Sequence, residues 1–217
     1  DPWWKLANKP PETERESRLP ATLTIPGIHQ STLAGIGDVA AQSGFVGDFT
    51  NYPFLTGLQP DLYRCFMSTT WAHASARGAT SLLHPDSHFT DEKAGRLRSE
   101  TYRRLRRHWQ FVNELQLFAE IHHLVVYGVH VYGRAATEIS FDNASALYHP
   151  ETVLRSYQHD GSGEEPGFKF EGRWDLRPHR GRLQRVTDYV LNVWHEILED
   201  ALVPVRQTRM VYAVNTA

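Results

Sequence analysis

The fold of this chain is decided by residues 78–88, which read Gly-Ala-Thr-Ser-Leu-Leu-His-Pro-Asp-Ser-His. Gly78 predicts the end of a helix, and the short apolar run over residues 79–83 predicts a buried strand that ends at His84. Helical patterns lie on both sides of this strand along the chain. Alternation of helix and strand at this spacing predicts an α/β protein with helices on the faces of a sheet.

The two helical patterns flank the strand closely. Asp61 is a candidate cap for a helix whose apolar face is formed by Leu62, Cys65, Phe66, Thr69 and Ala72. After the strand, Thr90 or Asp91 opens a helix whose core side is marked by Leu97, Thr101, Leu105 and Trp109. Both patterns predict amphipathic helices that pack on the sheet.

Two further strands are expected, over residues 111–118 and residues 124–132, followed by a closing helix and a strand over residues 208–214. The closing helix is marked by Leu183, Val186, Val190, Trp194, Ile197 and Ala201. Residues 134–182 show few periodic elements. We therefore expect three regions: an extended or linker region with a weak helix (1–60), an α/β domain (61–133), and an irregular region with a closing helix and strand that is a candidate DNA- or partner-facing surface (134–217).

The first region has little core of its own. Asp1 to Pro20 predicts an extended stretch, and Ile25 to Phe45 predicts a weak helix. Residues 35–40 fit the dinucleotide-binding pattern GxGxxA, but no strand precedes them, so we interpret them as part of that helix. Residues 51–54, Asn-Tyr-Pro-Phe, are interpreted as a loop.

Composition narrows the class of protein. The 217 residues are 41% hydrophobic and 22% charged, which is typical of a globular protein. The 23 basic and 25 acidic residues give a net charge of −2, which excludes a polycation that coats nucleic acid. Cys65 is the single cysteine, so an internal disulfide and a four-cysteine zinc site are excluded. We expect no membrane span and a cytoplasmic location, and Asp1 in place of methionine suggests a segment of a longer polypeptide.

Histidines and one carboxylate gather after the predicted strand. His84, Asp86 and His88 alternate in the sequence, and the pair His122-His123 lies further along the chain. Such residues can bind zinc, which keeps a metal-dependent hydrolase or nuclease open as an alternative. We favour a polar loop at the strand end that binds no metal.

Arginines dominate residues 93–107. Six of them stand in this segment, partly neutralised by Asp91, Glu92 and Glu100. A solvated helix face and contact with a phosphate backbone both explain this imbalance. The candidate contacts to the DNA backbone are Arg96, Arg98, Arg103, Arg104 and Arg107.

Several pieces occur in a definite order: Asp61-Leu62-Tyr63, then residues 78–85, then Leu97-Arg98, then residues 111–118 and 125–132. In this order, residues 61–133 resemble the second half of the catalytic domain of large bacterial adenine-specific DNA methyltransferases, associated with restriction-modification or phage defence. The resemblance implies a Rossmann-like sheet, S-adenosylmethionine as cofactor and double-stranded DNA as partner. The remainder of the polypeptide or other defence-complex subunits are further expected partners.

The resemblance also implies a pocket for the flipped target base. Phe118 occupies the position of the family's aromatic residue that touches this base, and we expect His84, Asp86, His122 and His123 to line or orient the pocket. The family's glycine-rich cofactor loop and its Asn-Pro-Pro-aromatic turn are not present, so the cofactor site is expected N-terminal to this chain. A non-catalytic DNA-binding or assembly module stays open as a further alternative.

Overall fold

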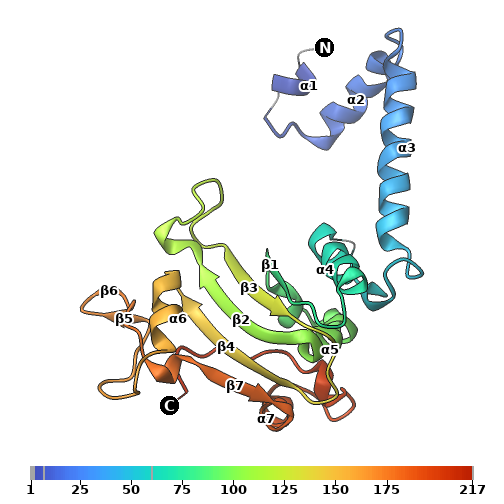
Figure 1. The fold of residues 1–217 in the computed structure, drawn as a ribbon. Helices are drawn as coiled ribbons and strands as arrows, with labels where there is room; N and C mark the ends of the chain where they lie inside the picture. The colour runs from blue at the N-terminus through green and yellow to red at the C-terminus, as the bar shows by residue number, and fades with distance from the viewer. Residues whose placement is uncertain (1–2, 7, 60, 217) are drawn as a thin grey trace. The chain divides into compact units, whose positions relative to one another are not determined.

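The first of two compact units is helical. The computed structural model describes residues 3–6, 8–59 and 61–216, and the chain divides into Asp1–Asp48 and Phe49–Ala217. The described helices of the first unit, blue in Figure 1, are α1 (Trp3–Leu6), α2 (Glu12–Leu23) and α3 (Ile28–Gly47). The weak helix is therefore confirmed, with the GxGxxA residues inside α3. The extended stretch is wrong where α2 forms, because Glu14 and Arg18 pair one turn apart on its surface.

Neither α2 nor α3 buries a side chain. The residues that the structure describes form no helix with both the length and the apolar character needed to traverse a membrane.

A five-stranded sheet forms the centre of the second unit (Figure 1). Its order is β1-β3-β2-β4-β7, formed by β1 (Thr80–His84), β3 (Val126–Tyr132), β2 (Leu105–Val112), β4 (Ser140–Leu147) and β7 (Gln184–Thr187). β3 is antiparallel to both β1 and β2, whereas β2 and β4 are parallel. β1, β2 and β4 therefore run in one direction, and β3 and β7 run in the opposite one. The expected α/β class is confirmed as a mixed sheet with helices.

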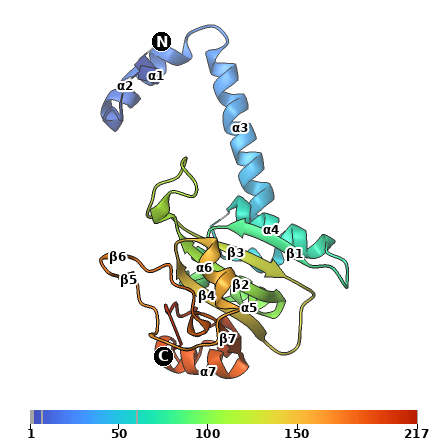
Figure 2. The same cartoon turned by 60° about the vertical axis from the view of Figure 1, so that its left-hand side comes forward.

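Helices lie on both faces of this sheet (Figure 2). They are α4 (Leu62–His73), α5 (Gly95–Arg104), α6 (Pro150–Ser156) and, after β7, α7 (Asp188–Leu198). Side chains alternate along a strand, so neighbours in sequence point to opposite faces. On one face Tyr102 of α5 stacks on Phe141, and Trp71 of α4 packs on Tyr132. On the other face Val153 of α6 packs in a core cluster with Phe111, Tyr127, Ala144 and Leu147.

The predicted cap of α4 is confirmed, but of its predicted apolar face only Cys65 is buried. The Asp61 carboxylate accepts a hydrogen bond from the backbone N–H of Tyr63 at 3.3 Å. Leu62 and Phe66 are exposed, and the buried face contains Arg64 and Met67 instead. Arg64 can be buried because its guanidinium bonds to the Asp91 carboxylate at 3.1 Å.

The arginine-rich helix is shorter than predicted. α5 ends at Arg104, and Leu105 already pairs with Tyr132 in the sheet. A β-bulge lies between Leu105 and Arg107 in β2. The four-residue spacing that predicted one helix up to Trp109 therefore spans two elements, the helix α5 and the strand β2. The strand expected over residues 111–118 is also shifted, because β2 ends at Val112.

The C-terminal part is more regular than expected in its middle and less regular at its end. Residues 134–182 contain β4, α6 and a hairpin of β5 (Lys169–Phe170) and β6 (Arg173–Trp174). The closing helix is confirmed from Asp188 onward, whereas Val186 lies in β7. The strand predicted over residues 208–214 is wrong: the Met210 N–H donates to the Phe89 carbonyl as an isolated contact, not as part of a ladder.

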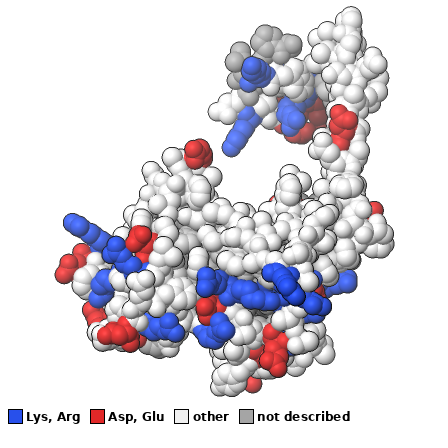
Figure 3. Space-filling model, in the orientation of Figure 1, with Lys and Arg blue, Asp and Glu red and all other residues white. Residues whose placement is uncertain are grey.

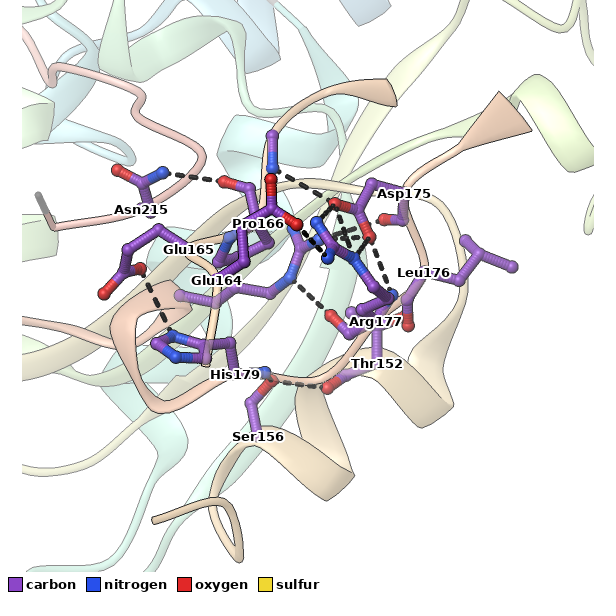
Figure 4. A network of polar contacts seen from close by, with 12 residues as sticks. Thr152, Ser156, Glu164, Glu165, Pro166, Asp175, Leu176, Arg177, His179 and Asn215 are labelled. Atoms are coloured by element: carbon purple, nitrogen blue, oxygen red, sulfur yellow. Dashed lines mark hydrogen bonds and ion pairs between the residues drawn. The ribbon is translucent and has the colours of Figure 1, made fainter. Parts of the chain in front are cut away.

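A buried ionic network anchors the segment that carries this hairpin (Figure 4). The Asp175 carboxylate is fully buried and accepts hydrogen bonds from the backbone N–H groups of Gly167 and Arg177. The Arg177 side chain bonds to the same carboxylate, and buried Arg182 lies 3.4 Å from it. Arg182 also donates to the carbonyls of Asp175 and Arg177. Thr152 of α6 donates to the Leu176 carbonyl, so this network joins the loop to the sheet's helical cover.

Candidate functional site

Three chain segments meet at one edge of the sheet because β1, β2 and β4 are parallel. His84 ends β1 and Pro85 follows it, the loop over residues 113–125 follows β2, and Pro150 opens α6 after β4. In Figure 1 the loop and α6 lie beside the arrowheads of β2 and β4. Open α/β sheets bind ligands outside the carboxyl ends of their parallel strands. This edge is therefore where a ligand is expected.

Phe118 stands on the loop at this edge and is 36% exposed. Its ring packs edge-on against Tyr127, with ring centroids 5.1 Å apart. It borders two apolar cavities of about 320 and 290 Å³. The first is also lined by His84, Pro85 and Ile121, and the second by residues that include Leu117 and Pro150. An accessible aromatic ring beside an apolar cavity can stack against a flat ligand such as a nucleobase.

The structure brings together only some of the residues predicted for this pocket. Phe118 and His84 border the same cavity. Asp86 is buried behind them, and its carboxylate accepts a hydrogen bond from Gln110 Nε2 at 2.7 Å. His122 and His123 lie on the Phe118 loop with their rings 4.4 Å apart, but they line neither of these two cavities.

A stack of buried histidines lies behind His84. The His84 and His130 rings are parallel with centroids 3.8 Å apart, and His108 follows at 4.7 Å from His130. His88 lies 5.6 Å from His84. We call these four residues the histidine stack. Gly128 leaves the room for it, because a Cβ there would lie 2.6 Å from His130 Nε2.

The histidine stack is neutral. Burial lowers the pKa of His108 to about 3, with a smaller contribution from His84. Burial, together with the other rings, holds the pKa values of His88 and His130 well below the ordinary value. His84 is fixed by hydrogen-bond contacts to the Pro85 carbonyl and the Tyr132 hydroxyl, at 2.7 and 3.1 Å. The stack therefore supports the strand end on which His84-Pro85 border the cavity.

Sequence reasoning missed His108 and His130 as members of this cluster. The signal that identifies them is the strand alternation, which places both on the face covered by α4 and α5. The described residues contain no group of three or more His, Cys, Asp or Glu side chains arranged to hold a metal ion. The His84 and His130 rings are stacked nearly parallel, so their nitrogens do not converge on one point as a tetrahedral site requires. The described residues therefore offer no ligand set for the metal-dependent alternative.

Arg98 differs from the other predicted DNA contacts because it is 2% exposed. Its guanidinium donates to the carbonyls of Gln207, His88 and Asp91 at 2.5–3.0 Å. Burial lowers its pKa from the usual arginine value. Arg98 therefore joins α5 to two loops and cannot reach a phosphate, which corrects its expected role.

The remaining candidate arginines reach the surface to different degrees. Arg103 and Arg104 both pair with Glu100, and Arg104 is packed over the Trp71 ring. Arg96 and Arg107 are exposed. Arg107 lies over the rings of Trp109 and Tyr157 on the α6 face. Figure 3 shows basic side chains gathered in a band on the visible face of this unit.

The glycine-rich segment does not offer a cofactor loop. Gly35 and Gly37 lie in the middle of α3, where a Cβ would meet open space. A nucleotide-binding glycine loop connects a strand to a helix N-terminus instead. Residues 35–40 therefore do not fit a nucleotide-binding loop by this criterion.

Comparison with known proteins adds no relative. No protein-family model matches the chain, and no curated protein matches it.

Proposed function

We propose that this chain is part of an adenine-specific DNA methyltransferase, which transfers a methyl group from S-adenosylmethionine to the adenine amino group. The observation that carries the proposal is the position of Phe118. Its ring is partly exposed and borders two apolar cavities at the carboxyl ends of the parallel strands. In the proposal it stacks on the flipped adenine. Restriction-modification or phage defence is the biological setting that the sequence resemblance suggests.

The chemistry of base flipping supports this role for Phe118. Taking a base out of a duplex costs a few kcal/mol, which the protein must offset by stacking and hydrogen bonds. Stacking on one aromatic side chain contributes about 1 to 3 kcal/mol per base. The Phe118 ring makes a T-shaped contact with Tyr127 and is 36% exposed, so part of it is accessible to a ligand without moving the sheet.

The sheet supports a Rossmann-like origin. β1, α5 and β2 form a crossover between parallel strands, which is the unit of open α/β sheets. β1 lies at the edge, and no strand among the described residues pairs with its outer side. In the proposal, the first half of a methyltransferase sheet joins there and carries the cofactor site.

Double-stranded DNA is the partner in this proposal. Arg107 stacks over Trp109 and Tyr157, which leaves its planar guanidinium at the surface for a phosphate. Arg96, on α5, is the other exposed candidate. Other subunits of a defence complex, or further parts of the polypeptide, complete the enzyme in this proposal.

The test is a Phe118→Ala substitution in the native polypeptide that carries these residues. It is expressed in bacteria whose DNA otherwise lacks methylated adenine, and nucleoside mass spectrometry measures the methylated fraction. Loss of stacking is expected to lower the initial rate of methylation by roughly 5- to 150-fold.

Leu124→Ala is the matched control, since Leu124 is exposed on the same loop and lines neither of the two cavities. This control should leave the rate within about twofold of the wild type. A wild-type protein that forms no methylated adenine would contradict the proposed activity. A Phe118→Ala rate equal to that of Leu124→Ala would contradict the role of the ring.

A further inference from the structure

Asn113 lies at the end of β2 and opens the loop that carries Phe118. It is fully buried, although the loop residues after it are largely exposed. Its backbone N–H donates to the Val125 carbonyl at 3.0 Å, and its carbonyl accepts from the Gln116 N–H at 2.7 Å. The Asn113 N–H therefore joins the two ends of the loop, and the Asn113 carbonyl closes its first turn.

The side chain of Asn113 reaches into the loop. Its Nδ2 donates to the carbonyls of Phe118 and Ile121, at 2.8 and 3.2 Å. Its Oδ1 accepts a hydrogen bond from the backbone N–H of Phe118 at 3.0 Å. The amide thus holds both polar groups of the Phe118 backbone. A carboxylate has no hydrogen to donate, so aspartate at this position would lose the two donated bonds.

Few other contacts hold this loop among the described residues. Leu115, Leu117 and Ile121 are exposed. The Phe118 ring makes a T-shaped contact with Tyr127, and the N–H groups of Leu124 and Val125 bond to His122 near the end of the loop. A loop with few buried apolar contacts opens locally at low free energy. The hydrogen bonds of Asn113 therefore decide where the Phe118 ring stands relative to the cavity.

We infer that Asn113 is a positioning residue that presents the Phe118 ring to a flipped adenine. The inference rests on the proposed function. Asn113 touches no ligand and acts through the Phe118 backbone, so removing it should have the same effect on base binding as removing the ring.

The experiment measures DNA binding by the full chain with two duplexes. One contains a single unpaired adenine, and the other has an abasic position in its place. The ratio of the two affinities reports base contact, because phosphate contacts are common to both duplexes. The variants are Asn113→Ala, Phe118→Ala, the double variant, and Asn143→Ala. Asn143 is the matched control, a buried asparagine on β4 whose side chain bonds to Gln184.

The wild-type chain should prefer the unpaired adenine by about tenfold or more. Asn113→Ala and Phe118→Ala should each reduce this preference to about twofold or less, and the double variant should match the single ones. Such non-additivity marks two residues that act as one unit. Asn143→Ala should keep the wild-type preference.

The outcomes separate the inference from the proposed function. A wild-type chain without the preference would contradict the proposed function, and the inference with it. A preference that Phe118→Ala loses but Asn113→Ala keeps would overturn the inference alone. So would a loss in Asn143→Ala equal to that in Asn113→Ala.

A measurement on the wild-type chain keeps the inference testable even if Asn113→Ala fails to fold. The Phe118 N–H is bonded to Asn113 Oδ1, so its hydrogen exchange should be at least tenfold slower than that of an unstructured amide. Exchange of the Phe118 amide at the unprotected rate would overturn the inference.

Discussion

The histidine stack and the Asp175 network bury polar groups in opposite ways. The stack contains four imidazoles, and no hydrogen-bond partner is found among the described residues for either ring nitrogen of His88 or His108. The network pairs one carboxylate with two guanidiniums and two backbone amides. The histidine stack tolerates burial because its rings are neutral. The Asp175 network tolerates burial because its charges are paired and hydrogen-bonded. Acid and substitutions should therefore damage the two regions differently.

Their pKa values express the same difference. Burial lowers the pKa values of the stacked histidines, so these groups resist the charged form. Burial alone would raise the pKa of Asp175, but the hydrogen bonds from Arg177 and from backbone amides outweigh burial and lower this pKa. Asp175 therefore keeps its charge in mild acid, in conditions where histidines in an unfolded chain already gain theirs.

The largest effect is expected from Asp175→Asn. The substitution keeps the shape of the side chain but leaves the charge of Arg182 buried beside a neutral group. Breaking one side of a buried pair costs about 3 to 5 kcal/mol. Urea unfolding at neutral pH should show this loss. Glu151→Gln, which removes an exposed pair with Arg155, should cost less than about 1 kcal/mol. Equal losses for both variants would contradict the importance of burial.

A smaller effect is expected from Gly128→Ala. The added methyl group would overlap His130 and come within 3.0 Å of His108 Cε1, inside a fully packed stack. Overpacking of this kind costs about 1 to 3 kcal/mol. Gly167→Ala serves as control, because a Cβ there meets its nearest atom at 3.7 Å. Thermal unfolding of the two variants checks the prediction, and a Gly128→Ala protein as stable as the wild type would show that the rings are loosely packed.

The smallest effect, counted per pH unit, is the loss of unfolding free energy in acid. His108 has a pKa of about 3 in the folded state, and the ordinary value in the unfolded chain is 6.5. Its contribution to stability is complete above pH 6.5 and is lost as the pH falls towards 3, by about 1.4 kcal/mol per pH unit. His108→Phe should flatten the pH dependence of the unfolding free energy by this amount in that range.

His29→Phe is the control for this measurement, since His29 is exposed on α3. It should leave the slope unchanged. A His108→Phe protein that loses stability in acid as steeply as the wild type would show that His108 is not buried in its neutral form.

The α/β class and the cap of α4 were predictable because short-range patterns encode them. Thr80 to His84 forms the predicted strand, and Asp61 forms the predicted cap. Phe118 and His84 border the same cavity, while the contact of Phe118 with a base stays a prediction. In these places local propensity and the tertiary structure agree.

Several misses come from pairing between charged or polar residues that no single sequence pattern encodes. Arg98 looked like a surface charge, but the carbonyls of His88, Asp91 and the distant Gln207 hold it in the core. Arg64 in α4 is buried for a similar reason, through Asp91. The order of strands hides the histidine stack, because His84, His108 and His130 come from three strands. No periodicity in a single segment reveals such contacts.

The open outer side of β1 also matters for handling the protein. β1 presents a row of backbone N–H and C=O groups without a partner strand among the described residues, and Leu83 beside them is more than half exposed. Exposed edges of this kind pair with other strands and promote aggregation. Concentrated solutions of these 217 residues should therefore associate through β1. A charged side chain introduced at Leu83 is the simplest way to keep the chain dispersed.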